Sequence, residues 1–298
     1  MSDIERAQAT WDTIDIAEVR SVAWLGVEAV NTDLWAEFSQ GRGPVAVVTD
    51  LLAARRPHTD LDGAALVCGD MQSERLFFEH TPTVSFRKVA GYDLSPASLA
   101  RYQPDGIEWE PHQVDCNQFE LPPEAYDLVV ASHGAHHVQN LEGFFAQARR
   151  SLRPGGLMYM YEWIGPTYLQ IPRRNRLFAT LLLLALFPSR RLRTTHTGRR
   201  KGLRYIQDPP SAFDPSEACN SLQLHPQFVA NFTTIVEYRH GGLTYPMFEG
   251  IAQNLPRNER TERRTRFVVR AEKWLTRKRL VHPLFVVAVG ERRESAQA

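Results

Sequence analysis

Short apolar runs alternate with helix-like segments along most of the chain after residue 60. Seven runs have the length and the β-branched or aromatic content of buried strands: AALVCG, VSFRKVAGYDL, IEWEPHQV, YDLVVASHG, LMYMYEWI, TTIVEYRHGG and HPLFVVAVGE. Between the fourth and fifth runs, NLEGFFAQARRSL has a helical apolar stripe, with Asn140 as the predicted N-cap and Pro154-Gly155-Gly156 as the stop. Strands that alternate with helices predict an α/β fold on a parallel sheet. A polar helical segment leads directly into the seventh run, which favours an antiparallel strand there.

Two segments interrupt this alternation. Residues 1–60 are predicted as a helical N-terminal extension, because SVAWLGVEAVNTDLWAEF spaces its apolar residues roughly along one helical face. Residues 163–231 are predicted as a helical insertion that covers the carboxyl edge of the sheet, in the manner of a lid. The predicted organisation is therefore an extension over 1–60 and one α/β domain over 61–298 that contains the insertion.

Composition narrows the classes of protein that fit. The chain has 298 residues, 43% of them hydrophobic, and a formal net charge of +1, so no global field attracts nucleic acid. The three cysteines are too few and too scattered for a disulfide framework, and no pair of them has zinc-ligand spacing. We assign no metal ligand from the sequence. The polar, acidic start of the chain does not resemble a signal peptide, and we expect a reducing, cytoplasmic setting.

Polar residues follow the predicted strands at the edge where an open parallel sheet binds ligands. Gly69 ends the first strand, and Asp93 ends the second, 24 positions later. An acid at that position suits the hydroxyl groups of a ribose. Ser95 and Pro96 then provide the expected cap and first turn of a helix. Asp115 follows the third strand, where a carboxylate can accept from the exocyclic amine of an adenine.

These features, with GYDLSPASLARYQ and the phrase YDLVVASHGAHHV followed by SLRPGG, resemble the class I S-adenosylmethionine-dependent methyltransferases, and a bacterial branch of them. The resemblance is strong over about residues 64–166. It implies a Rossmann-like sheet of order 3-2-1-4-5-7-6 with strand seven antiparallel. It also implies S-adenosyl-L-methionine as cofactor. The residues expected to bind it are Cys68, Gly69, Asp70, Asp93, Leu94, Asp115, Cys116 and Ser132.

The first turn departs from the glycine-rich pattern of that family. Val67 and Met71 stand where two outer glycines are usual, and only Gly69 remains. A sulfonium cofactor carries no pyrophosphate, so we interpret the loop as altered but functional. Asp70 and Glu74 keep acidic groups near a cofactor that carries a sulfonium and an ammonium. The alternative is a catalytically inactive binding protein on the same fold, which lost its activity through these two substitutions.

Methyl transfer is an in-line displacement at carbon, so the site must align the acceptor and supply a base if the acceptor is a hydroxyl. His133 follows the fourth strand, His137 lies in the next turn, and Glu162 ends the fifth strand. These three are the candidate catalytic residues. For the histidines the alternative is a packing or capping role in the turn, and for Glu162 it is an ion pair with an arginine. We expect O-methylation of a small molecule or glycan of secondary metabolism.

The insertion is strongly basic. Between Glu162 and Asp208 the chain has no acidic residue and ten Arg or Lys residues, around an apolar run at 177–187 that is too short to cross a bilayer. Three interpretations remain open: a buried lid helix with solvated arginines, a positively charged entrance for an anionic substrate, and a helix that rests on anionic lipid. The second assigns Arg173 and Arg176 to substrate binding. His240 is a further substrate-binding candidate.

Other properties stay open at this stage. Nucleic acid is disfavoured because the basic stretch lacks interleaved aromatic residues for base stacking. In FDPSEACNSL, Asp214, Ser216 and Glu217 resemble residues that start a helix, and we assign them a structural role. The acceptor atom and the oligomeric state do not follow from the sequence.

Overall fold

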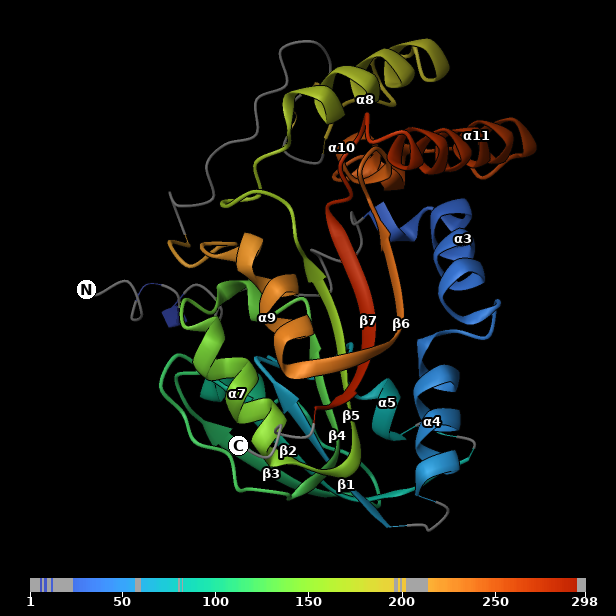
Figure 1. The fold of residues 1–298 in the computed structure, drawn as a ribbon. Coiled ribbons are helices and arrows are strands. Elements are labelled where there is room, and N and C mark those ends of the chain that lie inside the picture. Colours follow the sequence, from blue (N-terminus) through green and yellow to red (C-terminus); the bar gives the residue numbers. More distant parts are fainter. Residues whose placement is uncertain are drawn as a thin grey trace.

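A seven-stranded sheet forms the centre of the molecule (Figure 1), in a computed structural model that describes residues 6, 8–9, 12, 24–56, 60–79, 81, 83–195, 198, 200–201 and 214–293. The strands are β1 Leu61–Leu66, β2 Phe86–Asp93, β3 Glu108–Gln113, β4 Tyr126–Ser132, β5 Leu152–Trp163, β6 Phe232–His240 and β7 Phe285–Arg292. Their order is β3-β2-β1-β4-β5-β7-β6, and β7 runs antiparallel to both of its neighbours. The predicted strands, their order and the antiparallel β7 are therefore confirmed.

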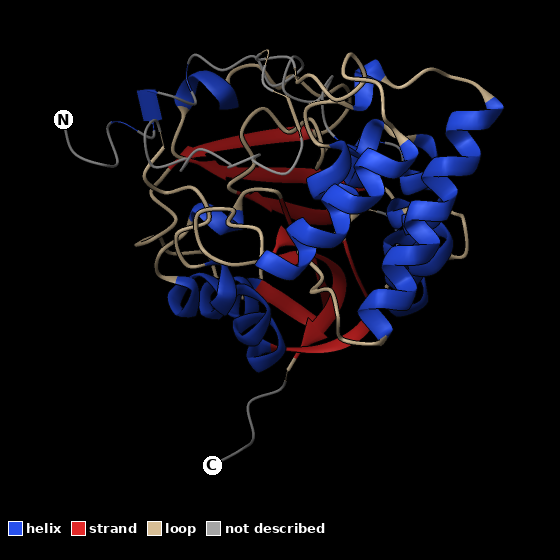
Figure 2. Ribbon diagram, turned by 90° about the horizontal axis from the view of Figure 1, so that it is seen from above, coloured by secondary structure: helices blue, strands red, loops and turns tan. Residues whose placement is uncertain are grey.

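Helices cover both faces of this sheet (Figures 1 and 2). The α-helices are α3 Glu28–Ser39, α4 Pro44–Arg55, α5 Leu76–Glu79, α6 Pro96–Leu99, α7 Leu141–Ser151, α8 Arg173–Leu186, α9 Leu224–Asn231, α10 Thr244–Phe248 and α11 Glu259–Arg277. Short 3-10 turns lie at η1 Trp24–Gly26, η2 Ala135–His137, η4 Ser221–Gln223 and η5 Ala252–Asn254. Helices α7 and α9 share one apolar core with the sheet, whereas α3, α4, α5, α8, α10 and α11 contribute to the other.

The sequence explains why the central strands form. Every residue of β1 and β4 is buried, as expected for strands covered on both faces. Asn140 caps α7, because its side-chain oxygen accepts from the Gly143 amide at 3.1 Å. The helix ends at Ser151, and β5 begins at once with Leu152, so the predicted stop at 154–156 belongs to the strand.

The two irregular segments pack closely on the α/β core. In the N-terminal part, α3 packs against α11 and β6, and α4 packs against β5. Within 163–231, α8 lies above the sheet and packs against α10, whereas α9 packs against α7 in the helical layer. The domain boundary at residue 60 stays a prediction. Among the described residues, none of the helices is long and apolar enough to cross a membrane.

Candidate functional site

A cavity of about 610 Å³ opens where β1, β2, β3 and β4 end, and we call it the carboxyl-edge cavity. Its volume lies within the range of about 300–1,000 Å³ that small-molecule sites occupy. The eight residues predicted to bind the cofactor all line it, and they are Cys68, Gly69, Asp70, Asp93, Leu94, Asp115, Cys116 and Ser132. Cofactor contact by these side chains stays a prediction, but the fold brings them together.

The turn after β1 keeps a glycine-like backbone although Val67 and Met71 replace the two outer glycines. Val67, Gly69 and Met71 have φ angles of 51°, 51° and 61°, in the left-handed region that a β-branched or long side chain adopts at a cost of about 1–2 kcal/mol. The Met71 side chain is fully buried in the apolar core rather than in the cavity. Val67 lines the cavity without filling it. The substitutions therefore leave space for a ligand.

Asp93 joins the end of β2 to that turn. One carboxylate oxygen accepts from the Gly69 amide and the other from the Ser95 amide, both at 2.8 Å. Burial raises the pKa of Asp93, and these two amides oppose the shift. Each carboxylate oxygen has a second acceptor site. Asp93 is thus able to accept from ribose hydroxyls while it holds the turn.

Asp115 follows β3, the strand next to β2 at the edge of the sheet. Its Oδ1 atom accepts from the backbone amide of Asn117 at 2.9 Å and from the Asn117 side-chain amide at 2.8 Å. The side-chain Oδ1 atom of Asn117 accepts in turn from the Gln139 backbone amide at 2.7 Å. This chain of hydrogen bonds connects the end of β3 to the segment after η2. Asp93 and Asp115 both line the cavity, and their predicted contacts with the sugar and the base of an adenosine stay predictions.

The three predicted catalytic residues lie in different environments. His133 lines the cavity directly after β4, with a φ angle of 60° and its ring centroid 4.4 Å from that of Tyr161. His137 also lines the cavity. Glu162 is fully buried and is not among the lining residues, contrary to the expectation that it faces the acceptor.

Glu162 instead holds the turn at η2. Its Oε1 atom accepts from the Gly134 and Ala135 amides at 2.8 and 2.7 Å, and its Oε2 atom lies 2.7 Å from Nδ1 of His136. Burial opposes the charged form of Glu162, but the charge and hydrogen bond of His136 lower its pKa below the usual value. The contacts of Glu162 identify it as a positioning residue for the turn that carries the histidines.

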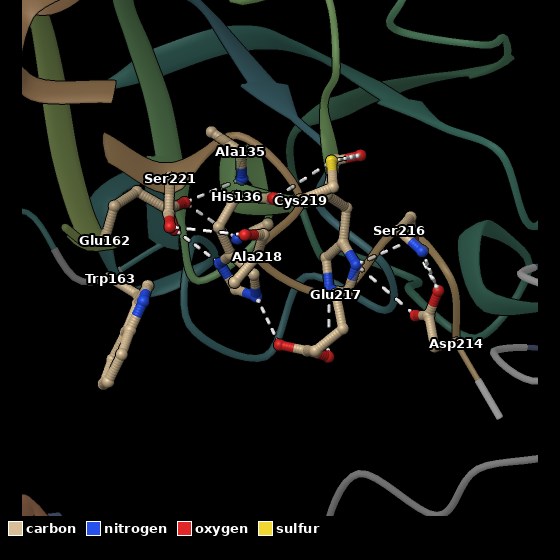
Figure 3. Close-up of polar contacts among 12 residues, drawn as sticks. Ala135, His136, Glu162, Trp163, Asp214, Ser216, Glu217, Ala218, Cys219 and Ser221 are labelled. Atoms are coloured by element: carbon tan, nitrogen blue, oxygen red, sulfur yellow. Dashed lines mark hydrogen bonds and ion pairs between the residues drawn. The ribbon is translucent and has the colours of Figure 1, made fainter. Parts of the chain in front are cut away.

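A cluster of polar side chains meets at the edge of the cavity (Figure 3). His136 places Nε2 3.3 Å from Oε1 of Glu217, and His137 places Nε2 3.9 Å from Oε2 of the same carboxylate. Nδ1 of His137 lies 3.0 Å from Oγ of Ser216 and 3.4 Å from Oδ2 of Asp214. We call these residues, with Glu162, the histidine cluster.

The histidine cluster shifts the pKa values of its members in opposite directions. Burial lowers the pKa of His136, but Glu162 and Glu217 outweigh it and raise that pKa to about 10. Burial and the charge of His136 lower the pKa of His137. Burial raises the pKa of Glu217, but the two histidines reduce it to about 2. The cluster is therefore strongly coupled electrostatically.

Sequence reasoning missed this cluster. Asp214, Ser216 and Glu217 lie in a turn before η4 rather than at the start of a helix, and the side chains of Ser216 and Glu217 line the cavity. Their spacing from the histidines, about 80 residues, gives no local pattern to detect. The run of acidic and hydroxyl residues in DPSE was the signal available, and it also suits an ordinary turn.

The end of the cavity opposite Asp93 and Asp115 is lined by aromatic side chains. Trp24 from η1, Tyr245 from α10 and Phe285 from β7 line it. His240 does not, because it is buried behind Trp24 and Phe285, with ring centroids 5.3 and 6.0 Å from theirs. Burial lowers the pKa of His240 to about 3, so it is neutral at pH 7.

The two arginines predicted to bind substrate do not reach the cavity. Arg173 and Arg176 are exposed on the first turn of α8 and are absent from the lining. The substrate-binding set predicted from the sequence is therefore not brought together by the fold. The aromatic lining that replaces it comes partly from the N-terminal segment, which the sequence pattern did not connect with a site.

Comparison with known proteins supports the assignment of the core. Residues 66–160 match the model of a methyltransferase domain family. The chain is 36% identical over 52 residues to sterol 24-C-methyltransferase ERG6B of Gibberella zeae, and 36% identical over 50 residues to the sterol 24-C-methyltransferase of Candida albicans. Those stretches are 17% of this chain, and the chain covers only 14% and 13% of the two relatives.

A solved structure extends the likeness over the whole fold. The cyclopropane synthase MmaA2 of Mycobacterium tuberculosis superposes with a TM-score of 0.52 at 15% identity, over 97% of this chain and 98% of that chain. S-adenosylmethionine is the methyl donor of the matching family. Residues 66–160 therefore match a methyltransferase-domain family, and the sheet order 3-2-1-4-5-7-6 is the one expected of class I S-adenosylmethionine-dependent methyltransferases.

Proposed function

We propose that this chain transfers a methyl group from S-adenosylmethionine to an oxygen of a small molecule or glycan. The observation that carries the proposal is the row of polar groups at one sheet edge, from Asp115 through Asp93 to Ser132 and His133, along a single cavity. In open α/β sheets, ligands bind at this edge. When bound, the cofactor supplies an electrophilic methyl group, and the chain has only to align the acceptor and remove a proton.

The two ends of the cavity suit the two ligands. The adenosine end has carboxylates at Asp93 and Asp115 for hydroxyl and amine donors. Asp70 and Glu74 line the same cavity near the turn after β1, and their charge favours a cationic sulfonium and ammonium. The opposite end, with its aromatic side chains, suits an acceptor with an apolar or ring-shaped body.

His133 is the proposed base. It follows β4 directly and lines the cavity between the two carboxylates and the aromatic end. A positioned histidine that removes the acceptor proton contributes a factor of about 10²–10⁴ in rate. Glu162 is buried outside the cavity lining and His137 belongs to the histidine cluster, so we assign the role of base to His133, which lines the cavity directly after β4.

Calorimetry with S-adenosylhomocysteine tests the cofactor part of this proposal. Submicromolar to micromolar binding by wild-type protein is expected, with loss of affinity in Asp93→Ala. Absence of binding heat with folded protein would sink the proposal. The transferase step is tested by incubation of the protein with labelled cofactor and a panel of hydroxylated small molecules. In that assay His133→Gln should slow transfer by about 10²-fold or more while it still binds S-adenosylhomocysteine.

The rival hypothesis of an inactive binding protein has less support. It requires Val67 and Met71 to obstruct the cofactor, whereas Met71 packs into the core and Val67 leaves the cavity open. The rival predicts no affinity for S-adenosylhomocysteine, so the calorimetric experiment separates the two hypotheses.

A role at a membrane surface is a second candidate, favoured by one observation. Leu177 and Leu181 on α8 are 54% and 53% exposed, on the same helix as the exposed Arg173 and Arg176. Exposed apolar residues beside cations are typical of helices that rest on anionic lipid. Co-sedimentation with phosphatidylserine vesicles at low salt tests this, and a Leu177→Ser, Leu181→Ser double variant should abolish any binding. Failure of the wild type to co-sediment would dismiss the candidate.

A further inference from the structure

Two histidine nitrogens and one carboxylate converge at the edge of the carboxyl-edge cavity. Nε2 of His136 and Nε2 of His137 lie 3.3 and 3.9 Å from the two oxygens of Glu217, and the three ligand atoms all lie within 4.8 Å of one another. Donors that share a tetrahedral ion at about 2.1 Å lie about 3.4 Å apart. The observed separations therefore suit a shared metal ion with only small movements of the side chains.

The opposite ring nitrogen of each histidine is held by an outer partner (Figure 3). Nδ1 of His136 lies 2.7 Å from Glu162, whose other oxygen is fixed by two backbone amides. Nδ1 of His137 lies 3.0 Å from Oγ of Ser216, and that hydroxyl donates to Asp214 at 2.6 Å. Metal-binding histidines almost always donate their second N–H group to such a partner, which fixes the ring and leaves the other nitrogen as a ligand.

We propose that His136, His137 and Glu217 bind a divalent transition-metal ion of the zinc class at the edge of the carboxyl-edge cavity. Two imidazoles and one carboxylate are the ligand set of catalytic zinc and non-haem iron sites, which keep coordination positions open. Nitrogen donors disfavour magnesium and calcium. No local motif indicates a metal site, because Glu217 lies 80 residues after His137 in the sequence.

All three ligands line the same cavity as His133, so the open positions of the ion face the space available to a substrate. An oxygen of the acceptor is the expected occupant, since a bound divalent ion stabilises an alkoxide or phenolate and lowers the pKa of a coordinated hydroxyl. This second part rests on the proposed methyl transfer. It narrows the acceptor class to molecules with an oxygen donor that coordinates metal. The metal site itself does not depend on that function.

The competing explanation is a metal-free network. In it, a protonated Nε2 of His136 donates a hydrogen bond to Glu217 across the same 3.3 Å. The cluster then has only a structural role, in which it holds the turn at η2 against the segment 214–217. The two explanations differ in a measurable way, because a hydrogen-bonded network whose histidine nitrogens carry protons has no affinity for zinc above that of surface histidines.

Calorimetric titration of chelator-treated, full-length protein with ZnCl₂ tests the site, with metal content measured by plasma mass spectrometry. Wild-type protein should bind one zinc ion per chain. His137→Gln and Glu217→Gln should each weaken that binding at least tenfold, and Glu162→Gln, which removes an outer partner, about 10–100-fold. His225→Gln is the matched control: His225 is a partly buried histidine paired with Glu237 at 2.7 Å, and its loss should leave zinc binding unchanged.

A spectroscopic readout keeps the test decisive if a variant does not fold. Co²⁺ added to the folded wild type should give the visible absorption of a low-coordinate N/O site, and acetohydroxamate should change that spectrum by occupying the open positions. No zinc bound to folded wild type, or equal binding in folded His137→Gln and Glu217→Gln, overturns the proposal. If acetohydroxamate leaves the Co²⁺ spectrum unchanged, the proposal that the bound ion has open coordination positions is wrong. Binding of S-adenosylhomocysteine is measured separately without metal, so failure of the metal site is distinguishable from failure of the proposed function.

Discussion

The carboxylate of Asp93 accepts a hydrogen bond from the backbone amide of Gly69 across 2.8 Å, which ties the end of β2 to the turn after β1. The two groups are 24 residues apart in sequence and come from adjacent parallel strands. In a turn that has lost its outer glycines, this bond helps to hold the backbone in its left-handed conformation. Asp93 therefore supports the shape of the cofactor turn as well as the proposed contact with ribose.

Substitution of Asp93 should weaken cofactor binding and the fold together. In Asp93→Asn, one side-chain oxygen is replaced by an NH₂ group, which opposes the N–H group of either Gly69 or Ser95. We expect about 10–100-fold weaker binding of S-adenosylhomocysteine by calorimetry, as for the loss of one or two hydrogen bonds to a charged group. The control is Glu110→Gln, an acid on β3 outside the cavity lining. Unchanged affinity in a folded Asp93→Asn protein would remove Asp93 from the cofactor site.

The two residues that replace glycines should respond differently to restoration of glycine. Val67→Gly relieves the strain of a β-branched residue in the left-handed region, but glycine also adds entropy to the unfolded chain. Because the two effects oppose each other, we expect the free energy of unfolding to change by no more than about 1 kcal/mol. Met71→Gly removes a fully buried side chain and should cost about 2–4 kcal/mol. Urea unfolding measures both. A rescue of binding by the double variant, as the inactive-protein hypothesis requires, is therefore not expected.

Alanine variants separate packing from backbone strain at these positions. Met71→Ala keeps the strained backbone but still buries one methyl group, and these two effects are of similar size, so it should be about as unstable as Met71→Gly. Val67→Ala keeps the strain and should be less stable than Val67→Gly. If all four variants had the same unfolding free energy as the wild type, neither the backbone strain nor the buried methionine would contribute to stability.

The parts of this protein that were predictable from sequence are the ones that neighbouring residues determine. The strands are short apolar runs, and an acid at the end of a strand stays at the sheet edge whatever surrounds it, so Asp93 and Asp115 were found. Sheet order required family resemblance, because strand pairing is a long-range property. The α7 cap at Asn140 was found because the capping bond spans only three residues.

The parts that were missed depend on contacts between distant segments. Glu217 meets His136 only because the segment before η4 folds back over the turn after β4. Glu162 was expected to face the acceptor, but its carboxylate turns inward to accept from the amides of that turn. Trp24 lines the cavity because η1 packs near α10, which no periodicity in the first 60 residues indicates.

Lys201 should make stability rise with pH on the alkaline side. The side chain is buried and donates to the Pro246 carbonyl at 3.0 Å. Burial lowers its pKa from 10.5 to about 8, and the charge of Glu249 only partly opposes this. The unfolded chain therefore binds more protons than the folded one between about pH 8 and 10.5. The cost of the buried charge, on the order of 3 kcal/mol at most, is fully present below pH 8 and is relieved as pH rises.

Comparison of the wild type with Lys201→Met measures this effect. We expect the unfolding free energy of the wild type, relative to that of Lys201→Met, to be higher at pH 10 than at pH 7. Urea titrations of both proteins at the two pH values measure this. Other groups that titrate in this range are common to both proteins and cancel in the difference. A pH-independent difference would mean that Lys201 keeps an ordinary pKa.

Asn175 should be the residue on which the position of α8 depends most. It is fully buried, and its Nδ2 atom donates to the carbonyl oxygens of Gly242 and His282 at 2.9 and 2.7 Å. Its Oδ1 atom accepts from the His282 amide at 3.1 Å, so one side chain satisfies three backbone groups at the edge of the sheet. Asn175→Leu keeps four side-chain heavy atoms branched at Cγ but leaves these groups buried without partners, at a cost of about 1–3 kcal/mol for each.

Because α8 packs mainly against α10, the damage should be local at first. We expect faster amide hydrogen exchange in α8 and in 280–284, with protection of β1 and β4 retained. The matched control is Asn231→Leu, whose Nδ2 atom donates to only one carbonyl, that of Gln227 at 2.9 Å. If Asn175→Leu exchanges like the wild type in α8, the helix is held by its apolar contacts, with Ala179 and Leu183 facing the core, and the buried amide is dispensable.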